Sequence, residues 1–201
     1  MAGAVILAGG ESRRLGQPKA LLDFNGKTLI EVMLEKLNDS FREITIVTDK
    51  PELYYNLPVR ITGDLLQDQG KSPLRGIHAG LSASELPYQF IVACDMPFIL
   101  PSLINYMGCY LTGFDAVVPC NGNYYQPLHA YYSRNCIAVI EEQISKGEYK
   151  VTEFYSHLNI HYISGDEITR YDPEEWSFFN VNTWADYEKA LNYFTAKQNM
   201  G

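Results

Sequence analysis

The sequence lacks the features that mark secreted, membrane-spanning and zinc-binding proteins. Its four cysteines, Cys94, Cys109, Cys120 and Cys136, lie at wide and irregular spacing without a Cys-x-x-Cys pair. We therefore expect buried free thiols in a reducing cytosol and no zinc site. No apolar run reaches membrane-spanning length. The first residues have no basic region and only a short apolar run, so we expect no signal peptide and a cytoplasmic protein.

The chain is also short of positive charge. It carries 16 basic and 24 acidic residues, which gives a net charge of −8. Broad binding of nucleic acid or of an anionic membrane requires basic surface, so we expect neither as a partner. The balance does not argue against binding a single nucleotide, because the cations that matter for one ligand are local.

Several nucleotide-binding and catalytic patterns are missing too. The sequence has neither the Gly-x-Gly-x-x-Gly dinucleotide fingerprint nor the P-loop. We find no Ser-His-Asp or Cys-His arrangement, internal repeat, low-complexity segment or linker. A chain of 201 residues supports one sizeable core, so we expect a single domain over residues 1–201.

Apolar periodicity predicts an α/β fold. The expected strands cover residues 4–8, 43–48, 60–62, 90–93, 115–119, 128–132 and 160–163. The expected helices cover residues 28–37, 74–84, 101–111, 135–146 and 183–194, with polar loops over 64–72 and after 163. Strands alternate with helices through the first half, which predicts a three-layer α/β/α arrangement around a mostly parallel sheet.

The stretch from Val5 to Lys19 is the strongest functional signal. An apolar strand ends at Gly9-Gly10, and Arg14 and Lys19 follow before the next apolar run. A glycine turn after a buried strand points backbone N–H groups at whatever lies beyond the sheet edge. The added cations predict a phosphate site at the carboxyl end of the strand. The alternative is an ordinary first strand followed by a solvated basic loop.

A second signal is Cys94-Asp95-Met96-Pro97, which follows the apolar strand at 90–93. Asp95 therefore lies at the same carboxyl edge of the predicted sheet. Mg²⁺ typically takes one or two carboxylates together with substrate phosphates and water, so Asp95 is the candidate metal ligand. The alternative is an aspartate that caps the following turn.

The stretch from Val5 to Lys19 resembles the signature of the sugar-nucleotidyltransferase-like superfamily, Leu-Ala-(Ala/Gly)-Gly-x-Ser-x-Arg-Met-Gly-x-x-Lys, and the segment around Asp95 resembles the family's Cys-Asp-Met-Pro motif, whose Asp binds metal and nucleotide. The Ala-Gly-Gly form looks most like the molybdenum cofactor guanylyltransferase (MobA) branch, with Leu15 in place of the usual Met. The resemblance covers nearly the whole chain and implies a Rossmann-like nucleotidyltransferase fold. It also implies a nucleotide-binding half over about residues 1–105 and an acceptor-binding half over about 106–201.

The resemblance implies transfer of GMP from GTP to molybdenum-loaded molybdopterin, with Mg²⁺ as cofactor and release of diphosphate. The implied catalytic residues are Arg14, Lys19 and Asp95. The implied GTP-binding residues are Leu7, Ala8, Gly9, Gly10, Lys19, Asp64 and Asp95. By residue type alone, Asp64 is a solvated loop charge.

Three further segments match the family's motifs. In Ser72–Leu81, Gly76 and Gly80 lie four apart on a predicted helix, which suits either close packing or ligand contact. The segment around Gln126 resembles the part of the family that takes the second substrate. Asn180 and Asn182 alternate on an extended segment, so they point the same way and bind either acceptor or metal, or serve as strand-end and cap hydrogen bonds. We assign Gln126, Asn180 and Asn182 to the acceptor.

Other functions stay open from the sequence. A molybdopterin cytidylyltransferase or a sugar-1-phosphate nucleotidyltransferase would use the same machinery with another base or acceptor, although those relatives more often carry Ala-Ala-Gly. A non-catalytic nucleotide-binding adaptor is the alternative of another class, but it would not need both Lys19 and Asp95. Proteins of molybdenum cofactor biosynthesis or molybdoenzyme maturation are the further partners that the resemblance suggests.

Overall fold

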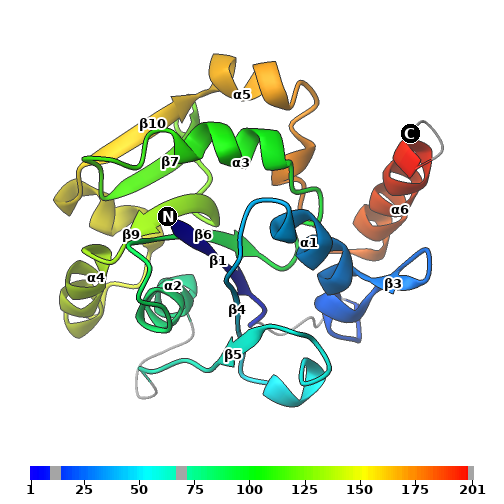
Figure 1. Cartoon of the computed structure of the whole chain (residues 1–201), viewed down its shortest axis with the longest axis horizontal. Helices are drawn as coiled ribbons and strands as arrows, with labels where there is room; N and C mark the ends of the chain where they lie inside the picture. Colours follow the sequence, from blue (N-terminus) through cyan, green and yellow to red (C-terminus); the bar gives the residue numbers. More distant parts are fainter. Residues whose placement is uncertain (10–14, 67–71, 199–201) are drawn as a thin grey trace.

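A single sheet runs through the centre of the computed structural model, which describes residues 1–9, 15–66 and 72–198 (Figure 1). Its strands lie in the order β10-β7-β9-β6-β1-β4-β5, with β8 paired to β7. The strands are β1 (Ala2–Leu7), β4 (Ile44–Val47), β5 (Arg60–Thr62), β6 (Tyr88–Ala93), β7 (Ala116–Asn121), β8 (Tyr124–Tyr125), β9 (His129–Ser133) and β10 (Ile160–Ser164).

Helices cover both faces of the sheet, because strand side chains alternate between two apolar cores. Ala4 and Ile6 of β1 belong to one core, whereas Val5 and Leu7 belong to the other. The first core is covered by α1 (Leu29–Asn38), α3 (Pro101–Gly108), α5 (Gly165–Tyr171) and α6 (Trp184–Gln198). The second is covered by α2 (Pro73–Ser82), α4 (Cys136–Ser145) and the 3₁₀ helix η3 (Val151–His157).

The carboxyl ends of the central strands meet at one edge of the sheet. β1 pairs in parallel with both β4 and β6, and β4 with β5. The pairing continues past the strand ends, since Ala8 N donates to Val47 O at 2.9 Å and Cys94 N donates to Leu7 O at 3.1 Å. The loops that leave β1, β4 and β6 are therefore neighbours at this edge, where ligands bind in open α/β sheets.

The end of the chain returns to its beginning. Helix α6 packs on the small hairpin of β2 (Asp23–Phe24) and β3 (Lys27–Thr28), as Figure 1 shows. The Tyr187 hydroxyl donates to Asp23 O at 2.6 Å, and the ring of Phe24 meets those of Tyr187 and Phe194 edge to face. This contact draws the segment before α6 across the sheet edge.

The expected fold is confirmed: a mixed, mostly parallel sheet lies between helical layers. The antiparallel pairs involve β9, which lies between β6 and β7, and the short strand β8, which pairs with β7. None of the helices in the described ranges has the length and apolarity needed to cross a bilayer.

Some local expectations are wrong. Residues Gly165–Tyr171, expected as a polar loop, form helix α5. The helix expected over 101–111 ends at Gly108. The cysteines are free, but they are not all buried: Cys136 is buried, Cys94 and Cys120 are partly exposed, and Cys109 is exposed.

Candidate active site

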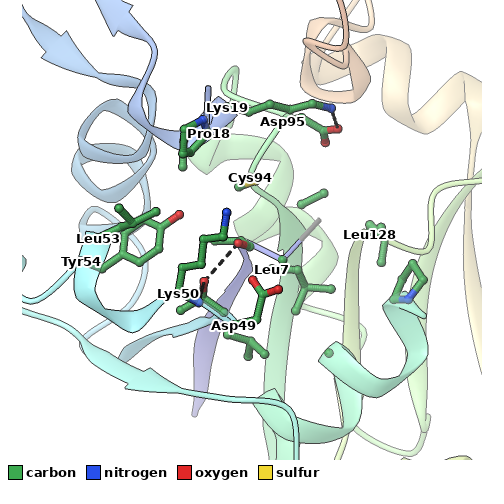
Figure 2. A pocket seen from close by; sticks show the side chains of 18 of the residues that line it. Leu7, Pro18, Lys19, Asp49, Lys50, Leu53, Tyr54, Cys94, Asp95 and Leu128 are labelled. Carbon is green, nitrogen blue, oxygen red and sulfur yellow. Dashed lines mark hydrogen bonds and ion pairs between the residues drawn. The ribbon is translucent and has the colours of Figure 1, made fainter. Parts of the chain in front are cut away.

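A cavity of about 710 Å³ lies beyond the carboxyl ends of β1, β4 and β6. Figure 2 shows it between the Lys19–Asp95 pair on one side and Lys50 and Tyr54 on the other. Its walls come from segments that are far apart in the sequence. They are Leu7–Gly9, Gly16–Ala20, Val47–Lys50, Leu53, Tyr54, Asp64, Ser72, Pro73, Gly76, Ala93–Asp95, Leu128 and Asn180.

The end of β1 forms the floor, as the sequence predicts. Leu7 and Ala8 are tied into the sheet by backbone hydrogen bonds and line the cavity. A Cβ atom added at Gly9 would meet nothing within 4 Å, so packing against the described residues does not require a glycine there. An open backbone beside a cavity is suited to close approach of a ligand. Gly10 and Arg14 lie outside the described residues.

Lys19 connects the two strongest sequence motifs. Its Nζ atom lies 3.0 Å from Asp95 Oδ2 and 2.5 Å from Asn182 Oδ1. The Lys19 and Asp95 side chains are only 18% and 20% exposed, so this ion pair is screened less than a surface pair. Asn182 thus lies beside the lysine that was assigned to the phosphates.

The Asp95 environment suits a divalent cation. The Lys19 ammonium group is a positive charge held between a carboxylate and an amide oxygen, which are ligand types that Mg²⁺ accepts. Asp95 Oδ1 is buried and accepts no hydrogen bond from the described part of the chain, so one oxygen is left for a ligand. No group of three His, Cys, Asp or Glu side chains clusters there among the described residues. A metal at Asp95 would take its remaining ligands from phosphate and water.

Backbone contacts hold Asp95 and Asn182 together. Val181 N donates to Asp95 O at 2.8 Å, which ties the segment before α6 to the end of β6. Asp186 then accepts hydrogen bonds from Asn182 N at 3.1 Å and from Thr183 N at 2.8 Å. The hydrogen bond from the Thr183 hydroxyl lowers the pKa of the Asp186 carboxyl, which stays charged at the N-terminus of α6.

Asp64 lines the cavity and is not a solvated loop charge. Its Oδ2 atom lies 2.9 Å from Arg75 Nε, and the Arg75 side chain is 6% exposed. Its Oδ1 atom accepts from Leu66 N at 3.1 Å. Arg75 belongs to helix α2, so the ion pair anchors the loop after β5 to the helix that begins at the cavity.

Helix α2 uses its glycines mainly for packing. A Cβ atom at Gly80 would lie 2.6 Å from Val5 Cγ1, and one at Gly76 would lie 3.2 Å from Leu7 Cδ2. Both glycines therefore face the sheet and bring the helix close to β1. Gly76 also lines the cavity, so the first turn of α2 forms part of the cavity wall.

Sequence reasoning missed the wall formed by the loop after β4. Thr48, Asp49, Lys50, Leu53 and Tyr54 all line the cavity. The signal was present, because the polar run Thr48–Lys50 follows a buried β-branched strand, as Asp95 follows another. Site residues were predicted only at strand ends that match a known motif, and this loop matches none.

The three residues assigned to the acceptor do not lie together. Asn180 lines the main cavity, and Asn182 contacts Lys19. Gln126 lines a second cavity of about 540 Å³ together with aromatic and charged side chains from residues 174–179 and from α6.

Neither the cysteine of the main cavity nor the histidine of the adjacent strand is prepared for covalent catalysis near neutral pH. Burial of the Cys94 thiol raises its pKa to about 12, so it is not a thiolate. The nearby strand β9 contains His129, whose pKa burial lowers to about 3. Phosphate binding and alignment, rather than a covalent intermediate, are what these residues can provide.

Comparison with known proteins agrees with this geometry. The model of the MobA-like NTP transferase domain matches residues 4–160. The match and the fold define a nucleotidyltransferase, and its main cavity lies at the edge made by β1, β4 and β6.

Similar sequences and a similar structure identify the family within the nucleotidyltransferases. The chain is 41% identical over 186 residues to a probable molybdenum cofactor guanylyltransferase of Pelotomaculum thermopropionicum, covering 92% of this chain and 90% of the relative. It is 37% identical to the molybdenum cofactor guanylyltransferase of Syntrophotalea carbinolica, covering 92% and 89%. The crystal structure of the molybdopterin-guanine dinucleotide biosynthesis protein A of Archaeoglobus fulgidus superposes with a TM-score of 0.84 at 30% identity, covering 98% and 100%. The chain belongs to the molybdenum cofactor guanylyltransferase family.

Proposed function

We propose that this enzyme transfers GMP from GTP to molybdenum-loaded molybdopterin, forming the guanine dinucleotide form of the cofactor and releasing diphosphate. The observation that carries the proposal is the contact of Lys19 with Asp95 and Asn182 beside the cavity at the ends of β1 and β6. The family membership supplies the choice of donor and acceptor.

The reaction is a displacement at phosphorus. An oxygen of the acceptor phosphate attacks the α-phosphorus of GTP, a new P–O–P bond forms, and the bond to the β-phosphate oxygen breaks. The acceptor phosphate is already ionised near neutral pH, so no general base is needed. Such chemistry depends on alignment and on stabilisation of charge, not on covalent help from the protein.

The described residues suit these roles. The backbone at Leu7, Ala8 and Gly9 lies along the cavity floor, where it would contact the nucleotide. Lys19 would stabilise negative charge as it shifts onto the departing diphosphate. Asp64, held by Arg75, would contact the nucleotide from the loop after β5. Gly10 and Arg14 complete the proposed phosphate loop, and their roles follow from the sequence alone.

Families of this kind generally use a divalent metal, and we infer Mg²⁺ here. Asp95 would hold it through the carboxylate whose Oδ1 is buried without a hydrogen bond from the described residues. When bound, Mg²⁺ neutralises and orients the phosphates of the nucleotide. Lys19 would then turn from Asp95 towards those phosphates.

A transfer assay tests the proposal. The protein is incubated with Mg²⁺, molybdenum-loaded molybdopterin and each of the four nucleoside triphosphates, and diphosphate release and the dinucleotide product are measured. We expect product with GTP, and none with any nucleotide when the acceptor is omitted. Product with CTP in place of GTP would make the chain a cytidylyltransferase, whereas nucleotide binding without turnover would make it an adaptor.

We place this reaction in the cytoplasm, with GTP and the molybdopterin cofactor as small-molecule partners. The acidic balance of the chain, −8 in net charge, supports partners other than nucleic acid or anionic membranes. Proteins that insert the finished cofactor into molybdoenzymes are the protein partners that this function would need.

A further inference from the structure

The second cavity is lined by side chains that suit a flat, polar heterocycle. It measures about 540 Å³, and its lining residues are Gln126, Glu174, Glu175, Trp176, Phe178, Phe179 and Lys189. We propose that this cavity binds the pterin ring of the acceptor, and that Trp176 and Glu174 are its main contacts. The inference rests on the proposed function, because that function supplies the pterin.

The two cavities share one segment of chain. Asn180 lines the main cavity, and the two residues before it, Phe178 and Phe179, line the second. Asn180 Nδ2 donates to Phe178 O at 3.0 Å, which links the residue of the main cavity to a residue of the second. Since consecutive Cα atoms are about 3.8 Å apart, the two cavities are separated by little more than one residue. An acceptor whose phosphate lies in the main cavity can place its ring in the second.

The aromatic wall is rigid. Trp176 stacks on Tyr193 with ring centroids 3.7 Å apart and an interplanar angle of 16°, and its ring lies 4.9 Å from that of Phe179. The ring of Phe98 meets Trp176 edge to face at 5.0 Å. Aromatic rings held in this way offer a fixed apolar surface for stacking or edge contact with a planar ligand.

Carboxylates border the same wall. The pyrimidinone edge of a pterin presents an amino group and a ring N–H side by side, and a carboxylate accepts such a pair. Trp176 Nε1 donates to Glu174 Oε2 at 3.2 Å, so this carboxylate is held at the edge of the Trp176 ring. Glu175 Oε1 is held separately, by Asn121 Nδ2 at 3.1 Å. Gln126 adds an amide that matches the pterin carbonyl.

A cation completes the match. Lys189 Nζ lies 5.4 Å from the centroid of the Trp176 ring and 5.0 Å from that of Phe179. The acceptor carries anionic sulfur groups beside its ring, and an exposed ammonium group suits them. The cavity thus combines carboxylates that can accept hydrogen bonds from the ring N–H groups, an aromatic face and a positive charge. These are the features that suit a pterin with anionic substituents.

Intrinsic fluorescence tests the proposal directly. The chain has two tryptophans, and Trp184, 48% exposed, lies outside the cavity lining. W184F leaves Trp176 as the sole tryptophan, and 6-hydroxymethylpterin is the titrant. We expect saturable quenching of Trp176 emission, and at least a tenfold weaker dissociation constant after the further change E174Q. The matched control is E188Q, on the exposed part of α6, which should leave the constant unchanged.

Guanosine is the second titrant, because guanine has the same hydrogen-bonding edge as a pterin. We expect weaker quenching by guanosine than by the pterin, because guanosine shares the edge but carries a ribose that the pterin lacks. Equal quenching by guanosine, absence of quenching by the pterin, or equal pterin affinity in the E174Q and E188Q variants would overturn the proposal. Circular dichroism checks that E174Q folds, as expected for a carboxylate that is 63% exposed.

The transfer assay separates this inference from the proposed function. GMP transfer without pterin quenching refutes the second cavity and leaves the function intact. Quenching that depends on Glu174, without GMP transfer to molybdopterin, supports the cavity and refutes the function. If both hold, E174Q should raise the KM for the acceptor at least tenfold and leave the KM for GTP unchanged.

Discussion

Lys19 and Asp95 lie 76 positions apart in the sequence and 3.0 Å apart in the structure. Their contact was predictable in outline, because each residue follows a buried apolar strand and parallel strands bring such residues to one edge. The place of Asn182 was not, since its approach to Lys19 depends on the tertiary contact of α6 with the β2–β3 hairpin. Alternation along an extended segment predicts on which side of the segment a side chain lies, but it does not predict which distant residue that side chain contacts.

Lys19→Met tests the phosphate role of the lysine. The change keeps an apolar stem and removes the charge, so it should lower kcat about a hundred- to thousandfold, or about 2.7–4 kcal/mol, and weaken GTP binding much less. Lys27→Met is the control, because Lys27 pairs with Glu35 on the exposed surface and is not among the residues that line the main cavity. Steady-state kinetics with saturating Mg²⁺ and molybdopterin measures both. Turnover within about threefold of the parent would refute the role of Lys19.

Asp95→Asn tests the metal site. The swap is nearly isosteric, so the fold should persist, but the loss of charge removes the strongest ligand for a hard cation. We expect at least a tenfold rise in the Mg²⁺ concentration that gives half-maximal turnover, together with a large loss of kcat. A Mg²⁺ titration of activity measures the shift. An unchanged Mg²⁺ requirement would show that Asp95 merely closes the turn after β6.

Helix α2 shows how an element brings the cavity wall into place. Gly80→Ala would put a Cβ atom 2.6 Å from Val5 Cγ1, against a stiff side chain in the middle of the sheet. Overpacking of this kind costs about 1–3 kcal/mol and outweighs the gain of about 1 kcal/mol in helix propensity. We therefore expect a lower free energy of unfolding, measured with urea. Gly108→Ala is the control, because its Cβ would lie 3.6 Å from the Tyr131 hydroxyl in ordinary contact; equal effects would refute the packing role of Gly80.

Helix α5 was missed because its only buried side chain is Ile168, so apolar periodicity does not reveal it. The usable signal was the capping box, in which Ser164 and Glu167 satisfy each other's backbone N–H groups. Short polar helices of this kind are specified by their ends. The main helices, in contrast, were predictable from their apolar faces to within a few residues.

Glu167→Gln tests this cap through its pH dependence. Hydrogen bonds from Ser164 and Tyr106 lower the pKa of Glu167 to about 2 from an ordinary value of 4.5. A lowered folded-state pKa stabilises the fold above pH 4.5, and this stabilisation is lost as the pH falls towards 2. The variant should therefore lose about 1 kcal/mol of unfolding free energy at pH 7 and less at pH 3.5. Asp166→Asn, in the same first turn, is the control; a pH-independent difference would contradict this account.

At the scale of the whole molecule, alternating strands and helices predicted the layers, and the motifs at the strand ends predicted the sheet edge at which the main cavity lies. The antiparallel strand β9 and the second cavity were not predictable, because both depend on how the second half folds back on the first. Gln126 illustrates this: its motif suggested a role in acceptor binding, but only the structure shows its neighbours Trp176 and Lys189. Sequence patterns report strand ends well and long-range side-chain neighbours poorly.

The main cavity joins β1, β4, β6 and the segment before α6, so a nucleotide bound there should stabilise the molecule as a unit. A ligand that binds only the folded state at a hundred times its dissociation constant adds about 2.7 kcal/mol of stability. For a chain of this size we expect GTP with Mg²⁺ to raise the Tm by about 5–10 °C.

The same thermal measurement reports base selectivity. If GTP binds more than tenfold tighter than ATP, CTP and UTP, a difference of about 1.4 kcal/mol, those nucleotides at equal concentration should raise the Tm by about half as much or less. Asp95→Asn should remove the part of the GTP effect that depends on Mg²⁺, because that part requires the carboxylate. Lys27→Met should keep the whole effect, since its side chain lies away from the cavity lining. Equal shifts with all four nucleotides would contradict guanine selection and leave a nucleotide site that does not distinguish bases.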